Sequence, residues 1–526
     1  MYVTYIVIGT LVPLIATVRR PWPSAARSDA ATNRGHMSTT AGVPTLHGKK
    51  AIFAIVALGF SSLSAALMQS LVIPIQAELP ELLGTTASNT SWVVTATLLA
   101  AGVTMPVAGR LADLIGKKPV MVASGVLLLV GSVVVALSDT VGPVIVGRVL
   151  QGAAMGYIPI AIAMVREIAP GHLRNQAVAG VSATLGVGGA IGLPLAAWIA
   201  QGSDWHLLFW VSAGLATAML VLTITAIPHV HDAHEGRMDW AGAAGLAVGL
   251  VSLLVGISKG NDWGWTEAST LGMIGGGIVV LLAWGVFELR TPQPLVDLRT
   301  TARRPVLVTN IGAVLIGFGM MAQSIVVPQL LEMPAATGYG LDQTILQAGL
   351  WMAPAGLMML VFSPLSATLI TRWGARNTLA LGAAVLATGY AIASQLMDAP
   401  WQLMVASLVC STGVAIGYAA MPTIVMNSVP EHEAASAVGV NSLMRSMGTT
   451  IAGAVMAVIL TSSTMELAPG VAVPTEGAFT LCFVVGAVAA LVGAGVVLLG
   501  PNQRADAATS LAEQQADAPE EPALSR

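Results

Sequence analysis

The sequence predicts an all-helical integral membrane protein with about fourteen transmembrane helices, arranged as two pseudo-symmetric six-helix bundles plus two inserted central helices. Composition, the spacing of apolar runs and an internal repeat predict this fold. Of 526 residues, 55% are hydrophobic and only 9% are charged, whereas soluble domains carry about 25% charged residues. This deficit of charge excludes an ordinary soluble fold.

Apolar runs long enough to cross a bilayer, about 20 residues each, recur with short polar breaks. They are predicted at 51–75, 91–109, 119–138, 143–165, 176–200, 207–228, 239–258, 269–289, 305–331, 346–370, 377–397, 401–425, 435–461 and 477–499. Cys410 and Cys482 lie inside such runs, so we interpret them as small core residues with no disulfide or metal role.

Basic residues test the span count independently, because they collect in cytoplasmic loops. They occupy alternate loops, at Lys49, Lys50, Arg110, Lys117, Lys118, Arg166, Arg174, Arg237, Arg290, Arg299, Arg303, Arg304, Arg372, Arg376 and Arg504. Lys259 is the clear exception. We therefore expect a multi-pass protein of the plasma membrane, with both ends of the fourteen-span body in the cytoplasm.

The two ends of the chain lie outside this body. In the N-terminal extension, 1–50, the apolar stretch 2–18 precedes Arg19 and Arg20, whereas a secretory signal carries its charge before the apolar core. We favour a true translation start at Met37 over a genuine extra span or anchor. Residues 500–526 are rich in Ala, Glu, Gln and Asp, which predicts a disordered cytoplasmic tail.

A repeat divides the body into two halves. Residues 152–157, Gly-Ala-Ala-Met-Gly-Tyr, recur at 413–418 as Gly-Val-Ala-Ile-Gly-Tyr, and the charged turn 109–118 has a degraded copy at 369–376. The offset of about 260 residues leaves room for two helices between six-helix halves. The predicted domains are an N-terminal bundle at 51–228, cytoplasmic loops with two inserted helices at 229–300, and a C-terminal bundle at 301–499. Transporters with paired halves bind substrate between them near the bilayer midplane.

The charged turn Gly109–Lys118, Gly-Arg-Leu-Ala-Asp-Leu-Ile-Gly-Lys-Lys, is the most informative motif. We expect Asp113 to cap or pair with a helix terminus, or with a cation of its own half, and Gly116 to permit a tight turn. Such a contact would hold one access state closed. The alternative is a topogenic, solubilising turn, which accounts for Lys117 and Lys118 but gives no reason for Asp113.

This turn resembles the loop between the second and third helices of the major facilitator superfamily, whose pattern is glycine, leucine, aspartate and then glycine followed by basic residues. Four further strings extend the resemblance to the fourteen-span drug and proton antiporter branch over 51–499: Trp92-Val93-Val94-Thr95-Ala96, Arg148-Val149-Leu150-Gln151-Gly152, Pro294-Leu295-Val296-Asp297-Leu298-Arg299 and Asn441-Ser442-Leu443-Met444-Arg445. The resemblance implies multidrug efflux driven by a proton gradient, with no other cofactor.

Two positions depart from that family pattern. Family members often carry an aspartate in the first span, nine residues before the proline that here is Pro74, and this place holds Ala65. Gln69 lies one turn further along the same face. The fifth-span pattern Gly-Pro-x-x-Gly-Gly is degraded at 192–198, which keeps Pro194. Proton exchange is therefore less strongly indicated than transport.

Two arginines, Arg148 and Arg445, lie deep in predicted spans, where charged side chains usually face a cavity or a partner. They either line a cavity, binding an anionic group or responding to a proton, or they bond to backbone carbonyls and helix ends and lock each half together. No carboxylate lies near a span centre. The other candidates for substrate binding or coupling are amides, which often form interhelical hydrogen bonds instead: Gln69, Gln151, Asn310, Gln323 and Asn441.

Other functions are less well supported. The loop with His229, His231, Asp232 and His234 has zinc-like spacing but no cysteine, so no metal site is predicted. No phosphate-loop, His-Glu-x-x-His or Gly-x-Ser-x-Gly string occurs, which argues against an ATP-driven pump and an enzyme. A secondary exporter, a secondary importer or exporter of an organic anion or metabolite, and a non-transporting receptor or scaffold stay open. The expected partners are a small-molecule substrate and the lipid bilayer, without nucleic acid, and the protein is predicted to be a monomer.

Overall fold

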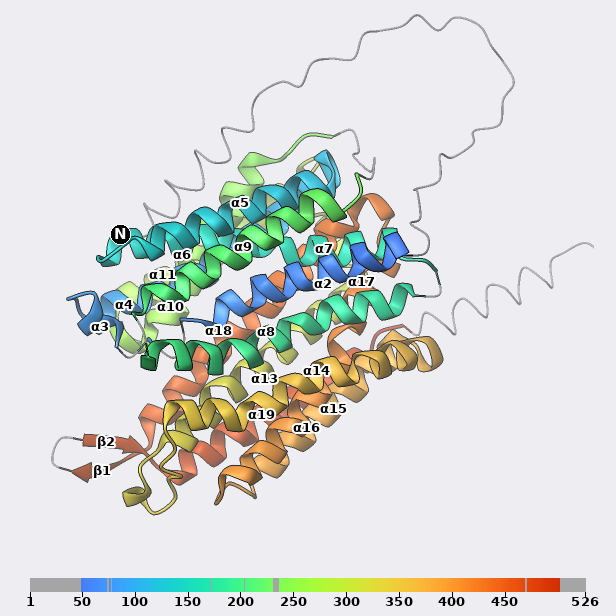
Figure 1. The fold of residues 1–526 in the computed structure, drawn as a ribbon. Helices are drawn as coiled ribbons and strands as arrows, with labels where there is room; N and C mark the ends of the chain where they lie inside the picture. The colour runs from blue at the N-terminus through green and yellow to red at the C-terminus, as the bar shows by residue number, and fades with distance from the viewer. Residues whose placement is uncertain are drawn as a thin grey trace, which may run out of the picture.

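The computed structural model describes residues 49–72, 75–76, 78–171, 173–202, 204–229, 236–468 and 471–501. Within them the chain is almost entirely helical, and the long helices run side by side in roughly one direction (Figure 1). The expectations for the N-terminal extension up to 48, for Pro74, for the histidine loop at 231–234 and for the tail from 502 lie outside the described residues.

The first six predicted spans correspond to helices in the upper part of Figure 1. These are α2 (Lys49–Ser70), α4 (Ala87–Ile115), α5 (Lys117–Ala136), α6 (Val141–Ala153) continued by η2 (Ala154–Gly156) and α7 (Tyr157–Ile168), α8 (Arg174–Gly202) and α9 (His206–Ala226), with the short α3 (Leu79–Leu82) between α2 and α4. Tyr157, Met121 and Leu58 lie in their shared apolar core. Apolar side chains such as Val221 also cover the outer surface, as expected for helices that meet lipid tails.

The inserted helices are α10 (Trp240–Trp263) and α11 (Ala268–Arg290), which form an antiparallel hairpin. Gly264 links them with φ +95°, a value that glycine adopts without steric cost. Helix α10 packs against α11 and also against α4 and α18. The short α12 (Leu298–Thr301) follows, and Asp297 caps it by accepting the N–H groups of Arg299 and Thr300.

The remaining helices include α15, α16 and α19 in the lower part of Figure 1. The elements are α13 (Arg304–Glu332), η3 (Ala335–Thr337), α14 (Ile345–Trp373), α15 (Ala375–Ala393), α16 (Pro400–Tyr418), α17 (Ala420–Ser428), η4 (Glu431–Glu433), α18 (Ala434–Ser462), β1 (Thr464–Ala468), β2 (Val471–Pro474) and α19 (Glu476–Leu498). The two strands pair antiparallel between α18 and α19.

The described residues contain thirteen helices, counting α6 with α7 and α16 with α17 as one each, that are long and apolar enough to cross a membrane. The remaining predicted span, 377–397, corresponds to α15, which has 19 residues and packs between α16 and α19. Its first turn holds Arg376 and Asn377, which lower its hydropathy. The predicted all-helical membrane fold with about fourteen spans is confirmed, whereas the small β-hairpin was not predicted.

The repeated motifs adopt similar local structures. Gly116 joins α4 to α5 with φ 93° and ψ 150°, and Gly374 joins α14 to α15 with φ 86° and ψ 155°. The first string, 152–157, contains the 3-10 turn η2 between α6 and α7, whereas the second, 413–418, forms the end of α16, and the helix breaks directly after it at Ala419. The turn glycines therefore repeat in backbone geometry, and each half has a helix break at or just after its copy of the string.

Candidate functional site

Helices α4 and α18, which come from different halves of the repeat, touch backbone to backbone. A Cβ atom placed on Gly109 would lie 2.6 Å from the Ala435 carbonyl oxygen and 2.9 Å from the Ser436 Cα. A Cβ atom on Gly439 would lie 2.6 Å from the carbonyl oxygen of Met105. Glycine at these two positions therefore permits the close crossing, as small residues do in membrane helix pairs.

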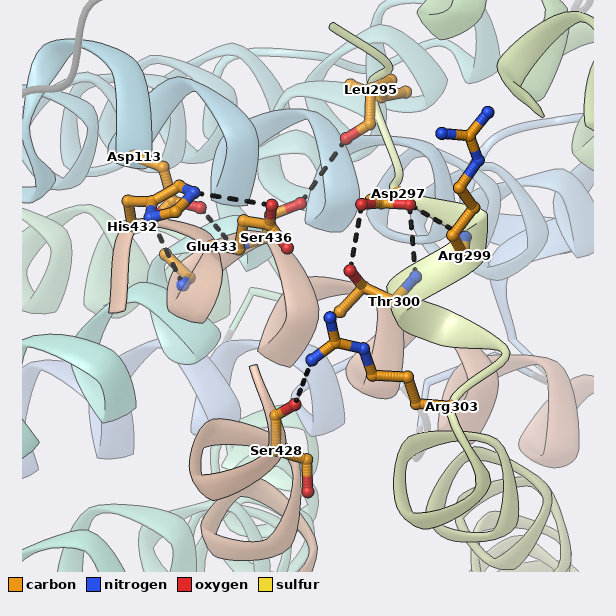
Figure 2. A network of polar contacts seen from close by, with 11 residues as sticks. Asp113, Leu295, Asp297, Arg299, Thr300, Arg303, Ser428, His432, Glu433 and Ser436 are labelled. Atoms are coloured by element: carbon orange, nitrogen blue, oxygen red, sulfur yellow. Dashed lines mark hydrogen bonds and ion pairs between the residues drawn. The ribbon is translucent and has the colours of Figure 1, made fainter. Parts of the chain in front are cut away.

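Asp113 lies at this crossing, in the last turn of α4, and is only 2% exposed. Its carboxylate accepts the backbone N–H groups of Ala435 at 3.2 Å and Ser436 at 2.8 Å (Figure 2). Glu433, the N-cap residue of α18, makes no side-chain cap of its own. Because a helix N-terminus leaves N–H groups unsatisfied and favours negative charge, Asp113 caps a helix of the opposite half.

The loop 292–297, which follows the inserted helices, lies beside this contact. The Ser436 hydroxyl donates to the Leu295 carbonyl at 3.5 Å, and Arg303 donates to the Ser428 carbonyl at 3.4 Å (Figure 2). A cavity of about 250 Å³ separates the loop from α4 and α18, and Arg110, Asp113 and the loop line it. Three segments far apart in sequence therefore meet where Asp113 caps α18.

The two lysines of the turn have partners within the first half. Lys117 is 3% exposed and pairs with Glu167 at 2.7 Å. Lys118 donates to the carbonyls of Ile224 at 2.8 Å and Ile227 at 2.7 Å, at the end of α9. A cation at a helix C-terminus is favourable. Both lysines thus hold helices in place, and neither is simply a solvated charge.

Arg148 lies in α6 and is 2% exposed. Its Nε donates to the Val93 carbonyl at 3.2 Å and its Nη1 to the Gln151 side chain at 2.7 Å, and Gln151 donates to Ser132 at 2.9 Å. These bonds join α6 to α4 and α5. The arrangement matches the locking alternative for Arg148, although no carboxylate in the described part of the chain forms an ion pair with it.

Arg445, in α18, is half-buried, and its guanidinium carbon lies 4.5 Å from the centre of the Tyr418 ring. One turn earlier, Asn441 donates to Asn310 of α13 at 2.9 Å. Gln323 donates to the Ser407 carbonyl at 3.5 Å. The side-chain amides of α13 and α18 therefore form hydrogen bonds between helices, whereas Arg445 stacks on an aromatic ring.

The other predicted residues lie elsewhere in the fold. Gln69 is half-buried in the last turn of α2, and Ala65 is fully buried. Pro194 lies inside α8, 3.7 Å from a Cβ atom placed on Gly349 of α14. The predicted residues thus form separate groups. Two of them lie where the halves meet: Pro194 on α8 beside α14, and the group around Gly109 and Asp113, which adds a charged hydrogen-bonded contact to α18.

Sequence reasoning missed two features of this region. Lys259, the exception to the charge pattern, is 1% exposed, bonds to Ser91 and pairs with Asp262 at 2.9 Å. A buried, paired lysine does not report which side of the membrane a loop occupies. Leu295 lies in the string 294–299, and nothing in the sequence indicates its contact with Ser436.

Comparisons with known proteins identify the family. A family model described as Major Facilitator Superfamily matches residues 58–453 and, in a second match, 309–525. An uncharacterised MFS-type transporter of Mycobacterium tuberculosis is 28% identical over 394 residues, which span 74% of this chain and 56% of that protein. Multidrug transporter protein MdtP of Bacillus subtilis is 23% identical, over 76% of this chain and 74% of that protein.

Solved structures show a similar fold. The human organic anion transporter MFSD10 superposes with a TM-score of 0.62 at 15% identity, covering 86% of this chain and 100% of that chain. The xylose transporter XylE from E. coli, in a partially occluded inward-open conformation, gives a TM-score of 0.55 at 13% identity, covering 84% and 97%. At these identities the likeness concerns the fold alone.

Proposed function

The chain belongs to the Major Facilitator Superfamily, and we propose that it exports drugs or other small lipophilic or organic compounds across the plasma membrane in exchange for protons. Proteins of this superfamily are multi-pass membrane transporters that bind small-molecule substrates within the membrane. Efflux is supported by curated relatives named as multidrug resistance proteins, at low identity.

The observation that carries the proposal is the cap that Asp113 places on α18. In alternating access two halves rock about a central site, so a contact between the halves at one end has to break in each cycle. Hydrogen bonds to a charged group contribute about 1.5–3 kcal/mol each. Two such bonds hold the closed state firmly but still reversibly, as a gate requires.

A proton on Asp113 would weaken this gate. Protonation removes the negative charge that attracts the α18 terminus and leaves a neutral carboxyl with less capacity to accept the N–H groups of Ala435 and Ser436. We therefore assign Asp113 a gating role in proton coupling. It does not need to touch the exported compound.

Accumulation assays test the transport proposal. Cells that express the protein should accumulate less of some compounds, in a panel of lipophilic cations, neutral drugs and organic anions, than cells expressing Asp113→Asn at equal protein level. A protonophore should abolish the difference. Equal accumulation of every compound in both cell types would mean that efflux does not need Asp113, and equal accumulation in cells with and without the protein would contradict efflux itself. A difference that survives the protonophore would contradict proton coupling.

Orientation has a separate test. We propose that the Asp113 contact faces the cytoplasm, because the basic loops do. Single cysteines introduced as Thr86→Cys and Pro474→Cys should react with an impermeant thiol reagent added to intact cells, whereas Thr301→Cys should not. Labelling of Thr301→Cys from outside would reverse the assignment of sides.

Transport of an organic anion is the second candidate. It is favoured by Arg445, which is half-buried and forms no ion pair with a carboxylate among the residues that the structure describes. An arginine on an aromatic face keeps donors for a carboxylate or phosphate group. If this candidate is correct, Arg445→Lys should reduce transport of anions selectively within the same panel.

A further inference from the structure

The inserted helices carry two carboxylates that meet at one end of the hairpin. Asp239 is the N-cap residue of α10, and Glu288 lies in the last turn of α11. A Cβ atom placed on Gly242 would contact Oε1 of Glu288 and Oδ2 of Asp239. The two oxygens therefore face the same point on α10.

Three of the four carboxylate oxygens lack hydrogen-bond partners. Glu288 is 2% exposed, and no donor reaches either of its oxygens with full hydrogen-bond geometry, although the Leu295 and Val296 N–H groups and the Trp284 indole lie close; Oδ2 of Asp239 also accepts none. Only Oδ1 of Asp239 is satisfied, by the Gly242 N–H at 2.8 Å. The indole N–H of Trp284 is directed to the Gly242 carbonyl at 2.8 Å. Keeping the buried Glu288 charged beside the partly buried Asp239 is costly, because desolvation of Glu288 and repulsion between the two carboxylates act together.

We propose that Asp239 and Glu288 form a proton-binding site that holds one proton between the two carboxylates. A shared proton removes the repulsion and turns two unsatisfied oxygens into a short, strong hydrogen bond. A metal cation fits less well, since Ca²⁺ takes about 6–8 oxygen ligands. Among the described residues no group of three metal-ligating side chains occurs.

The charged groups around the pair do not replace the proton. Arg237 precedes Asp239, and its backbone N–H is bonded to Gln293. Arg299 of α12 donates to the Leu289 carbonyl at 3.1 Å. Arg290 follows Glu288 by two residues. The other charged groups line the cavity bordered by the loop 292–297: Arg110, Asp113, Asp297, His432 and Glu433. No described cation forms an ion pair with Asp239 or Glu288.

The loop 292–297 connects this pair to the Asp113 contact. The backbone N–H groups of Leu295 and Val296 lie close to Glu288 without completing hydrogen bonds. The Leu295 carbonyl accepts the hydroxyl of Ser436, whose N–H is capped by Asp113. Release of the shared proton would therefore draw the loop toward Glu288. This inference goes beyond the proposed function and does not depend on transport.

Infrared difference spectroscopy between acidic and alkaline pH tests the proposal, using the purified full-length protein in lipid nanodiscs. The wild type and an Asp113→Asn background should both show a protonated-carboxyl band that persists at neutral pH and disappears at alkaline pH, so that this band does not come from Asp113. Glu288→Gln and Asp239→Asn should each lose this same band, because each removes one partner of the shared proton. The matched control is Glu267→Gln, an exposed carboxylate at the start of α11, which should keep it.

The outcomes separate the alternatives. Asp239→Asn keeps a side chain suited to an N-cap, so it carries the test alone if Glu288→Gln fails to insert. Persistence of the neutral-pH band in Asp239→Asn would overturn the shared proton. Loss of the band from the wild type on adding Na⁺, K⁺, Mg²⁺ or Ca²⁺ at constant pH would show metal binding and would also overturn the proposal.

Discussion

In the charged turn after α4 and in its copy after α14, a basic residue donates to backbone carbonyls near the C-terminus of another helix. Two residues after the turn glycine, Lys118 donates to carbonyls at the end of α9, and Arg376 donates to the Gly500 carbonyl at 2.8 Å, just beyond α19. Helices α9 and α19 are the last spans of their halves. This part of the motif therefore stabilises each half internally.

The two copies differ three residues before the glycine. The first holds Asp113, which caps α18 with two backbone hydrogen bonds. The second holds Thr371, whose hydroxyl accepts the Asn175 side chain at 3.3 Å, at the start of α8. The same geometry thus places a charge between the halves in one copy and a neutral hydroxyl in the other, so the two pseudo-symmetric contacts are unequal in strength.

Substitution of Lys117 shows how much of the stability of the first copy of the turn comes from charge, because the second copy has the neutral Ala375 at the equivalent position. Lys117→Met should cost about 3 kcal/mol, since it leaves the largely buried Glu167 without this partner. The melting temperature in detergent should fall clearly. The double variant Lys117→Met with Glu167→Gln should recover much of the loss; no recovery would mean that the charge pair is not the cause.

Gly109 tests the close approach that lets Asp113 reach α18. Gly109→Val would force α4 and α18 apart, and overpacking of this kind costs about 1–3 kcal/mol, or roughly a 5- to 150-fold shift between access states. Ala437 lines the cavity beside Asp113, so a cysteine introduced as Ala437→Cys reports whether this end of the protein is open. Its labelling by an impermeant thiol reagent in inside-out vesicles should rise, and transport should fall. Gly214→Val, where a Cβ atom meets nothing within 4 Å, is the control and should leave both unchanged.

The unequal copies predict unequal effects of matched substitutions. Asp113→Asn keeps the size but removes the charge, so hydrogen bonds to a charged acceptor become hydrogen bonds to a neutral one, and the contact should weaken by about 1–2 kcal/mol, a roughly 5- to 30-fold shift toward the open state. Thr371→Val should change the same reporter by only about twofold, because it removes one exposed neutral hydrogen bond, which contributes about 0.5 kcal/mol. Equal effects of the two variants would show that the charge of Asp113 does not set the gate.

The sequence predicted that Asp113 would cap a helix terminus, but it did not predict which helix. An aspartate beside a helix-breaking glycine indicates a helix terminus by residue type, but the terminus belongs to α18, more than 300 residues away, and only folding brings it there. Arg148 marked a buried site, yet its partner is the Val93 carbonyl, and backbone groups leave no trace in sequence. Glu288 lies at the end of the predicted span 269–289, and its burial against Asp239 depends on how α10 and α11 pack, which the sequence does not show.

The smallest expected effect concerns the part of the motif that both copies share. Lys118→Met and Arg376→Met should each cost about 0.3–1 kcal/mol, because each removes a cation from a helix C-terminus and leaves the contact between halves in place. The two variants should therefore lower the melting temperature by similar small amounts and leave the Ala437→Cys reporter at its wild-type level. Changed labelling of the Ala437→Cys reporter in Lys118→Met alone would show that Lys118 also contributes to the contact between the halves. The distinction between Lys118 and Arg376, which stabilise their own halves, and Asp113, which joins the halves, would then be wrong.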